Sequence, residues 1–256
     1  MLEGHISKAF DGDLAALHIR TLEMGGLVLD QVREAARAYA EWDSNAAERV
    51  IDRAASVSAY DTSIGRDELT LIARRQPVSR DLRAIFALAK CAAELESAGG
   101  EARKIARTVL RETGRPARAT SVDVRHLANL AIGLLRRSLE VLDRIDCDAA
   151  AEVIASDEEL DAEYEAGLRR LITRAMEEPR QLNVAMEAAF VLKSLERVGD
   201  HARILADHVR DIGPEEAPRA PGAADQALRT PHAPRPDFDS RRPPRGGEDE
   251  GKPRVL

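Results

Sequence analysis

The chain has 256 residues, of which 44% are hydrophobic and 32% are charged, a composition typical of globular proteins. Only eight residues are Phe, Tyr or Trp, which argues against the aromatic and β-branched cores of sheet proteins and favours an all-α fold. The net charge of −7 lacks the basic excess expected of a nucleic-acid binder.

The first half of the folded body is predicted to form three long helices, over about 11–40, 44–75 and 77–111. The second half repeats this scheme over about 121–145, 148–178 and 181–211. The first helix carries residues at the three- and four-residue spacing of a bundle seam: Leu14, Leu17, Thr21, Met24 and Val28. Helices joined by short loops prefer antiparallel neighbours, so each half should be a three-helix bundle.

Two features indicate an internal duplication. Pro77 and Pro179 are 102 residues apart, and each separates one long amphipathic segment from the next. In addition, residues 94–106 align without gaps on residues 194–206 at an offset of 100. The sequence therefore predicts two tandem three-helix repeats, residues 1–112 and 113–212.

Residues 213–256 are predicted to be a disordered tail. Nine of the twelve prolines lie after residue 212, among Gly, Arg and acidic residues without apolar periodicity. Eight basic and eight acidic residues cancel in this segment, so the net charge of −7 belongs to the helical body.

The cysteines and the N-terminus predict a cytoplasmic protein. Cys91 and Cys147 lie in apolar helical patterns without C-x-x-C spacing, which indicates reduced thiols. The first residues resemble no signal peptide, and no uncharged apolar run approaches the roughly 20 residues that cross a bilayer. We expect contact with a membrane only through partners.

The repeated third helix resembles a family signature. Residues 195–202 match the pattern L-E-R-[IV]-G-D-x-A of the PhoU family of bacterial phosphate-signalling regulators. Further family marks are Met24-Gly25, Gln76-Pro77-Val78 and Asp81-Leu82-Arg83, and the resemblance covers roughly residues 5–210. It implies a duplicated all-α fold and a non-catalytic, homodimeric regulator. Such proteins bind metal ions and restrain a phosphate-sensing histidine kinase and the ATPase of the phosphate ABC transporter.

The resemblance also implies metal binding through E/D-x-x-x-D motifs. Residues i and i+4 lie on one helix face about 5–6 Å apart, so Asp157 with Asp161, and Glu196 with Asp200, each project two carboxylates together. If the two helices face each other, four oxygen donors converge, a set that suits Mg, Mn, Zn or Fe without choosing among them.

Two alternatives to a metal stay open for these residues: solvated carboxylates on a helix face, or ion pairs with arginine. The bare spacing is not specific, because Glu48 with Asp52 also has it and is interpreted as a solvated helix face. Carboxylates at a bundle seam need a counter-charge or a hydrogen-bond partner, and Arg197 or Arg203 could supply it in place of a metal. His201, beside Asp200, is interpreted as a surface residue, with metal ligation as the alternative.

The first repeat has lost most of the motif. Its counterparts of Asp157, Asp161, Glu196 and Asp200 are, in the same order, Ala54, Ser58, Glu96 and Gly100. We therefore expect one metal centre, in the C-terminal repeat.

The function predicted from the resemblance is a metal-binding adaptor between the phosphate ABC transporter and a sensor histidine kinase. Asp81 and Arg83 match a family segment and are candidate partner contacts, although an acid also suits the first turn of a helix. Neither a G-x-x-x-x-G-K-[ST] loop nor a G-x-S-x-G motif occurs, so no enzyme is expected. The alternatives are a helical scaffold without a metal site and a carboxylate-bridged metal enzyme, which would need Glu-x-x-His pairs that this chain lacks.

Overall fold

The computed structural model describes residues 8–111 and 124–212, and all regular secondary structure in these two ranges is helical. The all-α prediction is confirmed. The helices are α1 (Lys8–Glu41), α2 (Ser44–Arg75), α3 (Arg80–Arg111), α4 (Val124–Arg144), α5 (Cys147–Ala155), α6 (Asp157–Glu177) and α7 (Leu182–Arg210), with a 3₁₀ turn at Pro179–Gln181. The predicted boundary between residues 112 and 113 and the predicted tail, 213–256, lie outside the described residues.

The duplication is visible in the turn after the first helix of each repeat. Trp42 and Ile145 occupy the left-handed region, with φ of 56° and 51°. The next residues, Asp43 and Asp146, cap α2 and α5 by accepting a hydrogen bond from the backbone N–H three positions on, at 3.1 and 3.0 Å. The same turn chemistry therefore recurs at an offset of 103 residues.

The second repeat differs from the first in its middle helix. We expected one helix over 148–178, and this prediction is wrong at Ser156, where α5 ends and α6 begins. The Ser156 hydroxyl donates to the carbonyl of Glu152 at 2.8 Å, a contact that bends helices. Three acids follow in the first turn of α6, where the helix dipole favours negative charge. Ser156 thus places Asp157 at a helix start.

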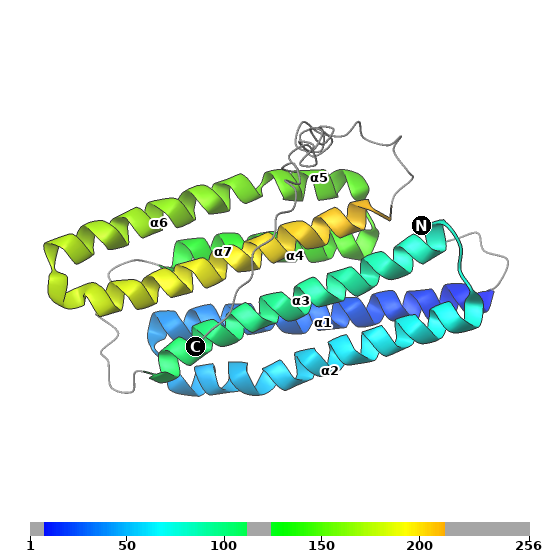
Figure 1. Ribbon diagram of the computed structural model, residues 1–256, viewed down its shortest axis with the longest axis horizontal. Helices are drawn as coiled ribbons and strands as arrows, with labels where there is room; N and C mark the ends of the chain where they lie inside the picture. Colours follow the sequence, from blue (N-terminus) through cyan, green and yellow to red (C-terminus); the bar gives the residue numbers. More distant parts are fainter. Residues whose placement is uncertain (1–7, 112–123, 213–256) are drawn as a thin grey trace, which may run out of the picture. The chain divides into compact units, whose positions relative to one another are not determined.

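Each repeat packs as a helical bundle, and the two bundles lie side by side. Helices α1, α2 and α3 contact one another in the first, and α4, α5 and α6 all contact α7 in the second. Between the repeats, α3 packs against α7 and α1 against α4 (Figure 1). The predicted seam of α1 is buried throughout, with Met24, Val28 and Thr21 fully inaccessible.

Small and polar side chains lie at close contacts between helices, both between the repeats and within the second one. Gly25 of α1 faces α4, and a Cβ atom added there would overlap Leu139 Cδ2. Ser138, buried on α4, donates its hydroxyl to the Ala202 carbonyl of α7 at 2.7 Å. The first contact joins the two repeats and the second fixes α4 on α7.

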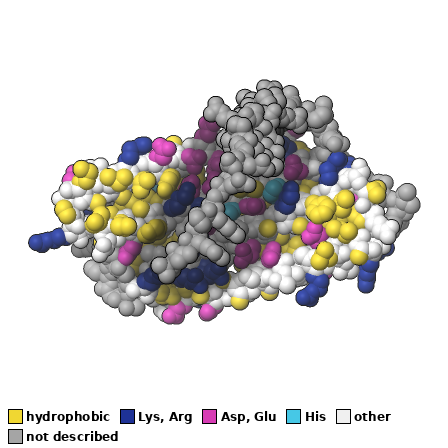
Figure 2. All heavy atoms as spheres, viewed as in Figure 1, with side chains coloured by type: hydrophobic (Ala, Val, Ile, Leu, Met, Phe, Trp, Pro, Cys, Tyr) yellow, Lys and Arg dark blue, Asp and Glu magenta, His cyan; other side chains and the backbone are white. Residues whose placement is uncertain are grey.

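The surface includes an apolar area at the end of the hairpin formed by α6 and α7. Figure 2 shows hydrophobic side chains gathered over this end of the molecule. The large apolar residues exposed there are Ile172, Met176, Leu182, Met186 and Phe190. In the described ranges, no helix combines the length and apolar character needed to cross a membrane.

The close approach of α1 and α4 at Gly25 can be tested with a matched pair of glycine-to-alanine variants. Gly25→Ala should lower the free energy of unfolding by about 1–3 kcal/mol, because the new methyl group collides with Leu139. Gly26→Ala should raise it by about 0.5–1 kcal/mol, because open space surrounds Gly26 and alanine is the better helix former. Equilibrium urea unfolding of both variants measures the difference, and equal effects at the two positions would contradict this packing.

Candidate metal centre

Helices α6 and α7 hold the four predicted ligands. Asp157 starts α6 and Asp161 follows one turn later, while Glu196 and Asp200 lie one turn apart on α7, and the two helices contact each other. Asp157 and Glu196 are buried, with 7% and 8% of their surfaces exposed, whereas Asp200 is half-buried and Asp161 is exposed. Two of the predicted ligands therefore lie inside the seam and two lie at its edge.

Arg203 is the counter-charge of Asp157. Its Nε donates to Asp157 Oδ2 at 2.9 Å. The arginine partner that the sequence analysis gave as an alternative to a metal is therefore present for this oxygen. Asp157 Oδ1, the other carboxylate oxygen, is buried and has no hydrogen-bond partner. Such an oxygen is costly to leave without a donor or a cation.

Lys193 holds Glu196 in the same way. Its Nζ lies 2.6 Å from Glu196 Oε1 and 5.4 Å from the centroid of the Tyr164 ring on α6. The hydrogen bond to Glu196 is the largest cause that raises the pKa of Lys193, so its ammonium form is favoured. Glu196 Oε2 is buried without a hydrogen-bond partner, like Asp157 Oδ1.

The pKa of Asp157 reports on its surroundings. Burial raises it first, and the negative charge of Asp161 raises it further, while Arg203 opposes both. The charges of Asp200 and Glu196 also raise it. Asp157 thus lies within the electrostatic influence of the other three predicted ligands, one on α6 and two on α7.

The four carboxylates do not form a closed ligand set in this structure. Across residues 8–111 and 124–212, no three side chains of His, Cys, Asp or Glu stand close enough to hold a metal ion. What fits a metal is the chemistry of the donors: two buried carboxylate oxygens, one from each helix, that no protein group satisfies.

The equivalent seam of the first repeat keeps only one of the four acids, Glu96. Ser58 donates its hydroxyl to Glu96 Oε1 at 3.5 Å, so the counterparts of Asp161 and Glu196 face each other across α2 and α3. Arg103, the counterpart of Arg203, has a buried Nε without a hydrogen-bond partner, and the residue corresponding to Asp157 is Ala54. The first repeat has kept the arginine and lost its acid.

Two further side chains have roles that differ from expectation. The interpretation of His201 as a surface residue is wrong, because its side chain is 15% exposed and its Nδ1 lies 2.7 Å from Glu94 Oε2 of the other repeat. Arg197, the other candidate partner of the acids, instead contacts Glu101 of α3 at 3.2 Å. Sequence reasoning did not single out Lys193, although its spacing of three from Glu196 is the signal for such a pair.

The candidate partner contacts lie at the start of α3. Asp81 and Arg83 are half-buried in its first turns, and their backbone N–H groups donate to the carbonyls of Val78 and Ser79 at 3.2 and 3.1 Å. Val78 and Phe86, which flank them in sequence, are exposed. On α3, it is Glu101 that contacts Arg197, the neighbour of Glu196, and Arg83 precedes Glu101 by 18 residues, or about 27 Å of helix. Asp81 and Arg83 therefore lie far from the carboxylates of α6 and α7.

Comparison with known proteins gives consistent matches. The family model of the PhoU domain matches two stretches, residues 21–109 and 124–209. A phosphate-specific transport system accessory protein PhoU homolog of Pseudomonas putida is 37% identical over 210 residues, covering 81% of this chain and 82% of the relative. The accessory protein PhoU of Escherichia coli K12 is 33% identical over 208 residues, covering 81% of this chain and 86% of the relative.

A solved structure matches as well. The crystal structure of PhoU from Pseudomonas aeruginosa superposes with a TM-score of 0.73 at 34% identity, covering 79% of this chain and 98% of that one. The family model spans both helical repeats, and the relatives are matched over most of their length. This chain belongs to the PhoU family.

Proposed function

We propose that this protein is a cytoplasmic, metal-binding regulator of phosphate uptake and phosphate-starvation signalling, acting as an adaptor between the phosphate ABC transporter and a sensor histidine kinase. The relatives named as accessory proteins of a phosphate-specific transport system support the link to the transporter. The histidine kinase and the homodimer expected from the family stay predictions. An adaptor acts by binding, so no reaction is assigned to the chain.

The main support for metal binding is the pair of buried carboxylate oxygens, one of Asp157 and one of Glu196, that have no hydrogen-bond partner. A divalent cation would be held by these two carboxylates, with Asp161 and Asp200 completing the donor set at the edge of the seam. It would supply positive charge where burial and three neighbouring acids raise the pKa of Asp157. Arg203 and Lys193 balance one oxygen each and leave the other available.

The competing function is a helical scaffold without a metal. The ion pair of Asp157 with Arg203 favours it, because that pair gives the acid a counter-charge within the protein. A scaffold would be indifferent to added metal, which separates it from the proposed adaptor.

Removing the motif on α6 should weaken metal binding. In a Mn²⁺ titration followed by calorimetry, Asp157→Ala/Asp161→Ala should weaken binding by at least about 10- to 100-fold relative to the unaltered protein. Glu48→Ala/Asp52→Ala removes two exposed carboxylates with the same four-residue spacing and should leave binding unchanged. Retention of Mn²⁺ by the first variant, or equal loss in both, would eliminate the centre on α6 and α7.

The raised pKa of Asp157 predicts a stability effect with a definite sign. The folded protein holds this proton more tightly than the unfolded chain, so the stability it contributes is present below the ordinary value of 3.8 and is lost as pH rises through the raised pKa. At pH 7 without metal, Asp157→Asn should therefore raise the free energy of unfolding, and the gain should shrink as pH falls toward 4. Urea unfolding across this pH range measures it, and a gain independent of pH would contradict the electrostatic cause.

Partner binding is tested at the start of α3. Pull-down of the transporter ATPase by the full chain should depend on phosphate and on metal, and Asp81→Ala/Arg83→Ala should reduce the captured ATPase by about 10-fold or more. Glu48→Ala/Arg107→Ala removes the same two charges from exposed positions and serves as the control. Capture that ignores phosphate and metal would favour the scaffold.

A further inference from the structure

A pocket of about 370 Å³ opens between α1 and α4, the first helices of the two repeats. Its walls carry four arginines and one acid: Arg33, Arg37, Arg125, Arg136 and Glu41. Its apolar lining consists of small and aliphatic side chains, Ala36, Ala40, Ala128 and Ile132, and Asn129 adds an amide. The pocket combines an apolar base with guanidinium groups from both repeats.

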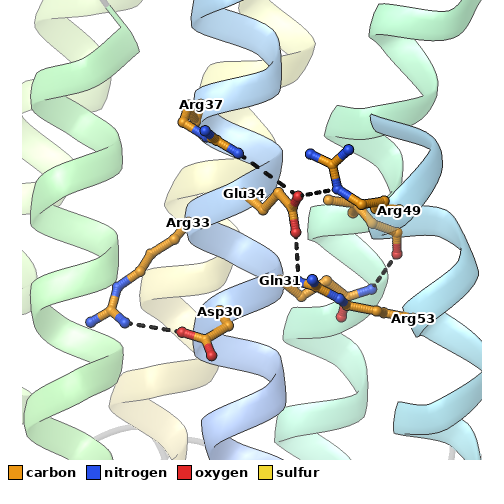
Figure 3. Close-up of polar contacts among 8 residues, drawn as sticks. Asp30, Gln31, Arg33, Glu34, Arg37, Arg49 and Arg53 are labelled. Carbon is orange, nitrogen blue, oxygen red and sulfur yellow. Dashed lines mark hydrogen bonds and ion pairs between the residues drawn. The ribbon is translucent and has the colours of Figure 1, made fainter. Parts of the chain in front are cut away.

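The acid nearest to Arg37 is already paired. Glu34 lies 2.8 Å from Arg49 and 2.5 Å from Arg53, both on α2, whereas Arg37 approaches it only to 3.8 Å (Figure 3). Three guanidinium groups thus share one carboxylate. The charge of Arg37 is incompletely balanced, and this residue lines the pocket.

Two of the other pocket arginines, Arg33 and Arg136, are also weakly balanced. Arg33 lies on the opposite side of α1 from Arg49 and Arg53, and its pair with Asp30, at 3.1 Å, is an exposed i,i+3 contact of little energetic value (Figure 3). Within the part of the chain that the structure describes, Arg136 has no carboxylate partner. Positive charge therefore collects here in a chain whose net charge is −7.

We propose that this pocket binds a small molecule carrying two or more phosphoryl groups and an apolar ring, the chemistry of a nucleoside di- or triphosphate. Guanidinium groups bind phosphate oxygens in a bidentate, charge-assisted manner. The volume of about 370 Å³ falls within the range of about 300–1,000 Å³ typical of small-molecule sites and exceeds the needs of one orthophosphate. The alanines and Ile132 offer a ring its apolar contact.

The site is independent of the carboxylates on α6 and α7. Its lining comes entirely from α1 and α4, so a ligand there contacts both repeats without touching the candidate metal centre. Divalent cations can therefore be left out of the binding assay.

The test is calorimetric titration of the full chain with ATP, tripolyphosphate and orthophosphate in metal-free buffer. ATP should bind one per chain and more tightly than orthophosphate, with tripolyphosphate between them because it lacks the ring. Arg37→Gln/Arg136→Gln should weaken ATP binding by about 10- to 100-fold, since two charge-assisted contacts are lost. Both side chains are exposed, and circular dichroism checks that the variant folds.

The matched control removes the same charge elsewhere. Arg66→Gln/Arg107→Gln alters two exposed arginines outside the pocket and should leave ATP affinity within about 2-fold of the unaltered protein, apart from screened long-range attraction. Equal weakening in both double variants, orthophosphate binding as tight as that of ATP, or no binding of either ATP or tripolyphosphate would overturn the proposal. If neither ATP nor tripolyphosphate binds, an acidic protein segment becomes the better candidate for the ligand of this pocket.

Discussion

Helices α3 and α7 pack against each other along buried alanines and leucines, and every other helix of the described body contacts one of these two. The family signature lies on this pair, because residues 94–106 and 194–206 are the aligned segments of α3 and α7. Glycine at position 199 brings Leu160 of α6 within 2.9 Å of where a Cβ atom would stand. The packing that builds the core thus also brings α6 against the helix that carries Glu196 and Asp200.

The distribution of charge follows from this arrangement. Glu101, buried on α3, is balanced by Lys104 at 2.7 Å and by Arg197 of α7 at 3.2 Å. Asp157 and Glu196 have one cation each and keep one oxygen unsatisfied. A buried carboxylate is tolerated when both of its oxygens have hydrogen-bond or ion-pair partners. A buried carboxylate oxygen without such a partner can still accept a cation. In the first repeat, Ala54, Ser58 and Gly100 stand in place of three of the four acids, and Arg103 keeps a buried donor without an acceptor.

Local signals predicted most of the fold. Apolar spacing located the helices. The break at Ser156 was missed because apolar residues continue on both sides of it, from Val153 to Leu160, although the acids after the serine are a helix-start signal. His201 was misread because its partner, Glu94, is 107 residues away in sequence. The arginine pocket arises from the approach of α1 to α4, which periodicity within each helix does not reveal.

We propose that one metal centre persists in the second repeat and none in the first. Anomalous X-ray diffraction from crystals of the full chain grown with Mn²⁺ tests it most directly. A single centre in the second repeat should give a manganese peak between α6 and α7, within bonding distance of Asp157 and Glu196, and no peak between α2 and α3. A peak at Glu96 in the first repeat, or no manganese between α6 and α7 at saturating metal, would contradict it.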